Sequence, residues 1–294
     1  MSWNPENFSD YSFSEYAQPF RSEKVDYTDP HFYQTTPAPI SQPTQPEMTQ
    51  NNPPDVTMKR KIWLFSLASV TAVVSVIVYA QMFSLAFGIG IVVLLFIHEM
   101  GHAMVMKLKG IPIGGMIFVP MLGAAVIMRR MPGSAKDEAE VGIAGPIAGA
   151  LAALICLFIA LAHPSEFGFS NVWASLAYFG FFLNLFNLVP IVPFDGGRVV
   201  AAIDRRVWLI GFIGLLAIQI WQLLSHNFSI WLPIFVILAG VQLVVRWRSP
   251  KTPEKQAYYA QSRGERIIIG LAYFTLIAFL VLGMTASHSL MAFF

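Results

Sequence analysis

Long apolar stretches constrain the fold of this 294-residue chain more than any other feature. A membrane-spanning helix needs about 20 mainly apolar residues, and seven stretches have that character: 62–82, 84–106, 141–162, 172–190, 207–224, 229–245 and 267–287. The composition agrees, since 55% of the residues are hydrophobic and 12% are charged, whereas soluble domains average about 25% charged residues. We therefore expect an all-α multi-pass membrane protein with about seven transmembrane helices.

The positions of the basic residues predict how these helices cross the membrane. With seven spans, all 19 Lys and Arg residues fall before the first span or in alternate loops, and the loops 163–171 and 225–228 contain none. Because basic loops stay in the cytosol, we predict a cytosolic N-terminus and a C-terminus outside, in a bacterial-type cell membrane. The bases are dispersed among short loops, so they indicate topology and not a surface for nucleic acid.

Residues 1–57 differ in character from the rest of the chain. They carry eight acids and two bases, with a second half rich in Pro, Gln and Thr, which predicts a disordered acidic cytosolic tail. Its scattered aromatic residues leave open a role as a docking segment for an adaptor. The first apolar run begins only at Ile62, so we expect residues 58–83 to form a first transmembrane helix and not a signal peptide. The single cysteine, Cys156, excludes an internal disulfide and a thiolate zinc cluster.

Two histidines and a glutamate lie near the end of the second apolar stretch. They form the sequence His98-Glu99-Met100-Gly101-His102. On a helix, residues four apart lie on one face, so both imidazoles can reach one zinc ion. Glu99 points to the side, where it can accept a proton from a water on that ion. The alternative, a pair of histidines that only hydrogen-bond between helices, would leave a costly glutamate in the membrane without a purpose.

A hydrolytic zinc site needs a third protein ligand and one open position. Asp195 is the one plausible acid at membrane depth. The second and fourth spans run in the same direction, so His102 and Asp195 approach the same boundary. The fourth helix is interrupted at this point by Pro190, Pro193, Gly196 and Gly197, which frees the Asp195 side chain to turn. We predict one Zn²⁺ ion with these three ligands.

These motifs together resemble the site-2 protease family of intramembrane zinc metalloproteases. The resemblance rests on HEMGH, on VGIAGPIAGALAA, and on Asn187-x-x-Pro190-x-x-Pro193-x-Asp195-Gly196, and it covers about residues 84–200. It implies a three-helix catalytic core in which His98, His102 and Asp195 hold zinc and Glu99 is the general base. It also implies cleavage in or near the transmembrane segment of a membrane-bound substrate, in regulated intramembrane proteolysis.

The resemblance also bears on residues outside the set of metal ligands. It suggests that Asn187 stabilises an oxyanion or binds the substrate backbone. Val192 stands where many relatives have Pro, and no predicted role depends on it. The tail and residues 201–294, with three additional spans, are not covered. Gly145, Pro146 and Gly149 are expected to be packing residues, because small residues let helices approach closely.

The stretch 111–128 is apolar but interrupted by Pro and Gly. We expect a re-entrant β-hairpin whose edge pairs with an unwound substrate, with Ile117 and Val119 among the substrate-binding residues. A cytosolic loop resting on the bilayer is the alternative. Two other functions also stay open at this point: a membrane protein that binds or transports zinc, and a protease homologue that binds transmembrane helices without cutting them.

Overall fold

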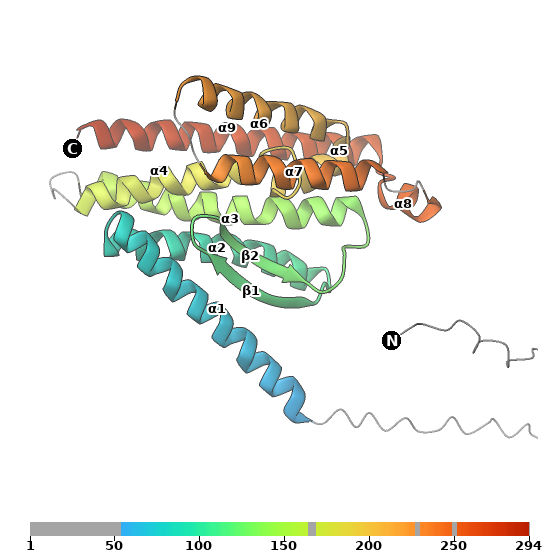
Figure 1. Cartoon of the computed structure of the whole chain (residues 1–294), viewed down its shortest axis with the longest axis horizontal. Helices are drawn as coiled ribbons and strands as arrows, with labels where there is room; N and C mark the ends of the chain where they lie inside the picture. The colour runs from blue at the N-terminus through green and yellow to red at the C-terminus, as the bar shows by residue number, and fades with distance from the viewer. Residues whose placement is uncertain (1–53, 164–168, 227–229, 249–251, 294) are drawn as a thin grey trace, which may run out of the picture. The chain divides into compact units, whose positions relative to one another are not determined.

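The fold consists of helices and one small β-hairpin (Figure 1). The computed structural model describes residues 54–163, 169–226, 230–248 and 252–293. In chain order the elements are α1 (Pro54–Met82), α2 (Leu85–Leu108), β1 (Ile113–Val119), β2 (Gly123–Met128), α3 (Ala135–Ala162), α4 (Phe169–Asn187), α5 (Asp195–Ile203), α6 (Val207–Leu224), α7 (Trp231–Arg248), α8 (Pro253–Tyr258) and α9 (Arg263–Phe293). Of the predicted tail, residues 54–57 form the first turn of α1, and the rest lies outside the described residues.

Each of the seven stretches predicted to span the membrane contains a helix. Among the described residues, five helices are long and apolar enough to cross a membrane, namely α1, α2, α3, α6 and α9. Among the described residues of α4, the apolar helical stretch is Val172–Asn187. The helix ends at Asn187 and does not continue to residue 190. The chain is an integral membrane protein, and the count of seven spans stays a prediction.

Helices α2, α3 and α4 pack against one another, and α9 packs along α4 (Figure 1). Small residues allow the close approach. A Cβ atom added at Gly101 of α2 would lie 2.4 Å from the carbonyl oxygen of Ala144 on α3. One added at Gly149 of α3 would lie 2.2 Å from Oδ1 of Asn184 on α4. The predicted packing role of Gly149 is therefore confirmed.

Residues 113–128 form an antiparallel hairpin in which Ile117 lies opposite Ala125. Strand β1 packs against α1, and β2 packs against α2. Two side chains of α1 accept hydrogen bonds from the hairpin backbone: Thr71 Oγ1 from the Phe118 N–H at 3.2 Å, and the Tyr79 hydroxyl from the Met121 N–H at 3.1 Å. Because α1 covers β1, the outer edge of β2 faces the other way. The hairpin is present, and its depth in the membrane stays a prediction.

The fourth apolar stretch is interrupted as predicted. Helix α4 ends at Asn187, and a second helix, α5, begins at Asp195. Its two glycines press against the intervening segment: a Cβ atom would lie 2.2 Å from the Leu188 oxygen if added at Gly196, and 2.3 Å from the Ile191 carbonyl carbon if added at Gly197. Nine residues that include two glycines give little helical signal, which is why α5 was not predicted.

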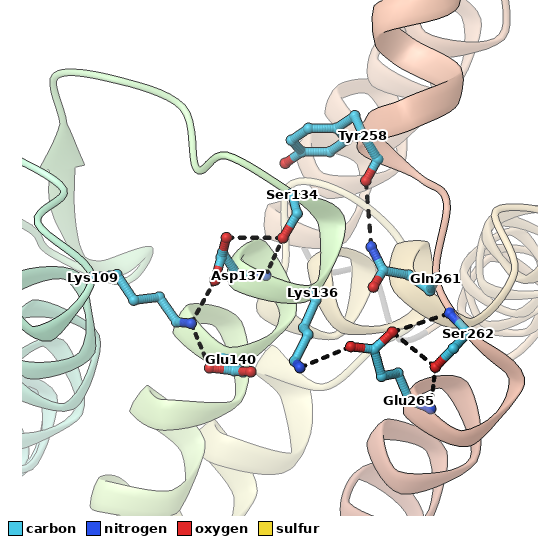
Figure 2. Close-up of polar contacts among 9 residues, drawn as sticks. All are labelled: Lys109, Ser134, Lys136, Asp137, Glu140, Tyr258, Gln261, Ser262 and Glu265. Atoms are coloured by element: carbon cyan, nitrogen blue, oxygen red, sulfur yellow. Dashed lines mark hydrogen bonds and ion pairs between the residues drawn. The ribbon is translucent and has the colours of Figure 1, made fainter.

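Ion pairs connect α2, α3 and α9 where α2 ends and the other two helices begin (Figure 2). Lys109 contacts both Asp137 and Glu140, and Lys136 contacts Glu265 at 2.8 Å. Ser134 caps α3 by accepting a hydrogen bond from the Asp137 N–H. Because most of these groups are partly or fully exposed, the pairs order the helix ends and contribute little to packing.

Candidate metal centre

Helix α2 brings its two histidines onto one face. His98 and His102 are one helical turn apart, and their Nε2 atoms lie 3.1 Å from each other. Both rings and the Glu99 side chain between them are buried, at 5%, 6% and 5% exposure. The ligand atoms of these three residues all lie within 4.8 Å of one another. The spacing in the sequence therefore produces the predicted convergence.

Asp195 reaches the same point from α5. Its Oδ2 atom lies 3.2 Å from His98 Nε2 and 3.1 Å from His102 Nε2. Two imidazole nitrogens and a carboxylate oxygen are common ligands of zinc, and tetrahedral ligands held about 2.1 Å from an ion lie about 3.4 Å from one another. The three atoms are close to that separation, so the residues fit a zinc ion.

The outward nitrogens of both histidines are held by acceptors. His98 Nδ1 donates to Asn184 Oδ1 at 2.8 Å, and His102 Nδ1 donates to the Val141 carbonyl at 2.7 Å. Asn184 is itself fixed, because its Nδ2 donates to the Gly180 carbonyl at 2.7 Å. Such partners leave Nε2 free for a metal and orient each ring toward it.

Asn184 is a residue that the sequence reasoning left without a role. It is 4% exposed in a mainly apolar helix, and Gly149 leaves the space that its side chain fills. The one available signal was a polar side chain at membrane depth, one turn before Asn187. Gly145 acts in the same way toward His102, since a Cβ atom there would lie 2.2 Å from His102 Nε2.

Glu99 points from α2 toward the hairpin. Its Oε2 atom accepts a hydrogen bond from the Val126 N–H of β2 at 2.7 Å. This bond uses a backbone N–H on the outer edge of β2. Asp195, and not Glu99, is the carboxylate within hydrogen-bond distance of both histidine Nε2 atoms. The glutamate and the metal ligands therefore have separate positions.

A cavity of about 730 Å³ contains the three predicted ligands and Glu99. Its walls come from β2, from the α4–α5 segment and from α6 and α7; the side chains include Val126, Phe186, Asn187, Arg198, Leu215, Gln222 and Phe235. Asn187 is therefore at the cavity, as predicted. Among the described residues that line the cavity, none belongs to β1.

Ile117 and Val119, predicted to bind substrate, do not line this cavity. Both lie on β1, which packs between α1 and β2. The strand that faces the metal ligands is β2, from Gly123 to Met128. The cause is the docking of α1 on β1, which the local sequence of the hairpin does not encode.

Comparison with known proteins places this geometry in a family. The model of peptidase family M50 matches residues 86–166 and 162–208. Residues 86–208 belong to peptidase family M50. This M50 core contains every metal-ligand candidate, and the match confirms the resemblance to the site-2 protease family.

The chain is similar to two proteins from Methanocaldococcus jannaschii. Zinc metalloprotease MJ0392 is 30% identical over 107 residues, which are 36% of this chain and 31% of that protein. The chain therefore matches about a third of the length of this curated relative. The solved site-2 protease from the same organism is 24% identical with a TM-score of 0.44, and the match covers 62% of this chain and 89% of that one.

Proposed function

We propose that this protein is an intramembrane zinc endopeptidase that hydrolyses a peptide bond in or near the transmembrane segment of a membrane-bound substrate. One observation carries the proposal: His98 Nε2, His102 Nε2 and Asp195 Oδ2 converge within 3.2 Å beside Glu99. The membership of residues 86–208 in peptidase family M50 supports it.

The chemistry needs one metal ion. His98, His102 and Asp195 would hold Zn²⁺, with an outer group of Asn184 and the Val141 carbonyl to orient the histidines. When bound, zinc supplies a Lewis acid that makes water nucleophilic at neutral pH and polarises a carbonyl. The protein contributes a buried, shaped cavity in which this Lewis acid acts.

Glu99 is the group that moves the proton. Its carboxylate accepts a proton from the attacking water and returns it to the leaving amide nitrogen. The hydrogen bond from the Val126 N–H fixes one carboxylate oxygen, so the other is available for the proton.

Substrate is expected to lie along β2. An extended peptide can add to a strand edge through main-chain hydrogen bonds. Residues of β2 line the cavity beside the ligands, although the Val126 N–H on that edge already donates to Glu99. Asn187 lines the same cavity, where its amide can donate to the substrate carbonyl as negative charge develops. An unwound transmembrane segment is the class of substrate that fits.

The orientation and partners complete the proposal. With the basic loops in the cytosol, the ends of α2 and α4 and therefore the metal centre are close to the cytosolic boundary. The acidic tail is available to an adaptor on that side. Both features rest on the charge pattern of the sequence.

The test compares purified wild type, Glu99→Gln and His98→Ala in detergent or liposomes. Zinc content is measured by elemental analysis, and activity by cleavage of a transmembrane model substrate. We expect wild type to bind one zinc ion and to cut. Glu99→Gln should keep zinc and lose activity by about 100- to 10,000-fold, whereas His98→Ala should lose both.

His226→Ala is the matched control, because this histidine follows α6 and does not line the cavity. It should behave as wild type. A wild type that holds zinc but does not cut indicates the homologue that only binds helices. Normal cleavage by Glu99→Gln contradicts the proposal.

A further inference from the structure

Helix α5, which carries Asp195, is contacted by a buried tryptophan that lies outside the metal centre. Trp208, on the first turn of α6, is 3% exposed, and its indole N–H donates to the Gly197 carbonyl at 2.8 Å. Gly197 follows Asp195 by two residues in the first turn of α5. The indole therefore contacts the turn that carries the third metal ligand.

The first turn of α5 depends on contacts of this kind. The residue before it, Phe194, makes no capping hydrogen bond through its side chain. A helix of nine residues is too short to be stable without tertiary packing. The position of Asp195 is therefore set by what α5 packs against.

Trp208 is itself held by an ionic cluster. The guanidinium of Arg246, at the end of α7, lies 5.3 Å from the centre of the indole ring, within the range of a cation–π contact. Its Nη2 atom lies 4.0 Å from Glu138 Oε1. Glu138 is 2% exposed, and its other oxygen accepts a hydrogen bond from the Tyr258 hydroxyl at 2.7 Å.

The cluster also adjoins the support of His102. Glu138 precedes Val141 by three residues on α3, and the Val141 carbonyl accepts the hydrogen bond from His102 Nδ1. Burial and the neighbouring Glu138 raise the pKa of Tyr258, so its hydroxyl stays protonated and keeps donating. The cluster therefore includes a residue of α3, the helix whose Val141 carbonyl orients His102, and contacts α5, the helix that carries Asp195.

We propose that Trp208 is a positioning residue for the metal centre: its indole holds the first turn of α5, and thereby Asp195, against His98 and His102. The Glu138–Arg246 pair keeps the indole in place. The inference rests on the proposed function only in taking the site to bind zinc. It assigns Trp208 no contact with substrate or with the metal.

The test uses the full-length protein and the Trp208→Phe variant, which keeps an aromatic ring but has no N–H donor. Zinc affinity is measured by competition with a chromophoric chelator. The loss of an outer partner typically costs about 10- to 100-fold in affinity, and we expect a loss in that range. The visible spectrum of the Co²⁺-substituted protein should also shift, because the carboxylate ligand is displaced.

Trp221→Phe is the matched control on the same helix, since Trp221 is 63% exposed. It should leave affinity and spectrum unchanged. If Trp208→Phe lowers the melting temperature but binds zinc as wild type does, with the same cobalt spectrum, Trp208 is structural only and the proposal is overturned.

Arg246→Lys decides the matter if Trp208→Phe does not fold. It keeps the charge near Glu138 and removes the planar group over the indole. Weaker zinc binding by this variant supports the proposal, and wild-type binding overturns it. A wild-type protein that binds no zinc contradicts the proposed function itself, a result distinct from failure of the Trp208 variant.

Discussion

At the scale of single residues, two asparagines one turn apart on α4 have different environments. Asn184 is buried and hydrogen-bonded to His98 Nδ1, whereas Asn187 lines the cavity. The first can act only through the histidine, and the second can meet substrate. Their substitution should therefore separate metal binding from turnover.

We expect Asn184→Leu to weaken zinc binding by about 10- to 100-fold, because His98 Nδ1 loses its acceptor. Asn187→Leu should leave zinc affinity unchanged and lower kcat by about 100- to 1,000-fold, the usual effect of removing one oxyanion donor. Chelator competition and substrate cleavage on both variants provide the measurement. Equal zinc affinity of Asn184→Leu and wild type would contradict the supporting role of Asn184.

Gly145 provides a steric test of the same centre. A Cβ atom there would lie 2.2 Å from His102 Nε2, so Gly145→Ala should push the ring away and weaken zinc binding by at least about 10-fold, as loss of ring orientation does. Overpacking of this kind costs about 1–3 kcal/mol in stability. The control is Gly214→Ala, where the added atom meets nothing within 4 Å.

Gly214→Ala should bind zinc normally and gain up to about 1 kcal/mol in stability, because alanine favours the helix. Thermal melting and zinc titration of the two variants are the measurements. If Gly145→Ala retains wild-type affinity, the close contact with His102 has no functional consequence.

The ligands were predictable from the sequence because their chemistry is local. His98 and His102 follow from helical spacing, and Asp195 follows from the need for a third ligand near the same membrane boundary. Asn184 and Trp208 were not predictable in the same way. Each acts through one hydrogen bond to another helix, and such a partner is defined only when the helices have packed.

At the scale of elements, the hairpin shows the same difference between what the local sequence determines and what the packing of the helices determines. The Pro and Gly residues of 111–128 predicted a non-helical segment, and the hairpin is there. Which strand faces the metal depends on α1, because Thr71 and Tyr79 attach the β1 side to that helix. The sequence of the hairpin is equally apolar in both strands, so it could not distinguish them.

We expect Thr71→Val and Tyr79→Phe to loosen the hairpin. Each removes an acceptor for a backbone N–H, which costs about 1–3 kcal/mol when the donor stays buried and unpaired. Substrate KM should rise while zinc affinity stays unchanged, since both hydroxyls hydrogen-bond to the hairpin backbone and not to a metal ligand, although Tyr79 also lines the cavity. Thr285→Val is the control, because the Thr285 hydroxyl bonds only within its own helix, to the Leu282 carbonyl. An unchanged KM in both hairpin variants would show that β2 does not hold substrate.

At the scale of the whole molecule, the path of the chain through the membrane depends on α7. This helix, Trp231–Arg248, overlaps the stretch 229–245 that is predicted to span the membrane. Its two terminal arginines follow an apolar stretch. If α7 crosses the membrane, the chain segments on its two sides must lie in different compartments.

Cysteine labelling tests this crossing directly. His226 precedes α7 and Gln256 lies on α8 after it, and both are exposed. With basic loops in the cytosol, His226→Cys should react with a membrane-impermeant maleimide in intact cells, and Gln256→Cys only after the cells are broken. The parent protein is the control, because its one thiol, Cys156, is buried. Labelling of both positions from the same side would mean that α7 does not span the membrane. The basic loops would then not all lie on one side, and the predictions of seven spans and of a cytosolic metal centre, which both depend on that arrangement, would be contradicted.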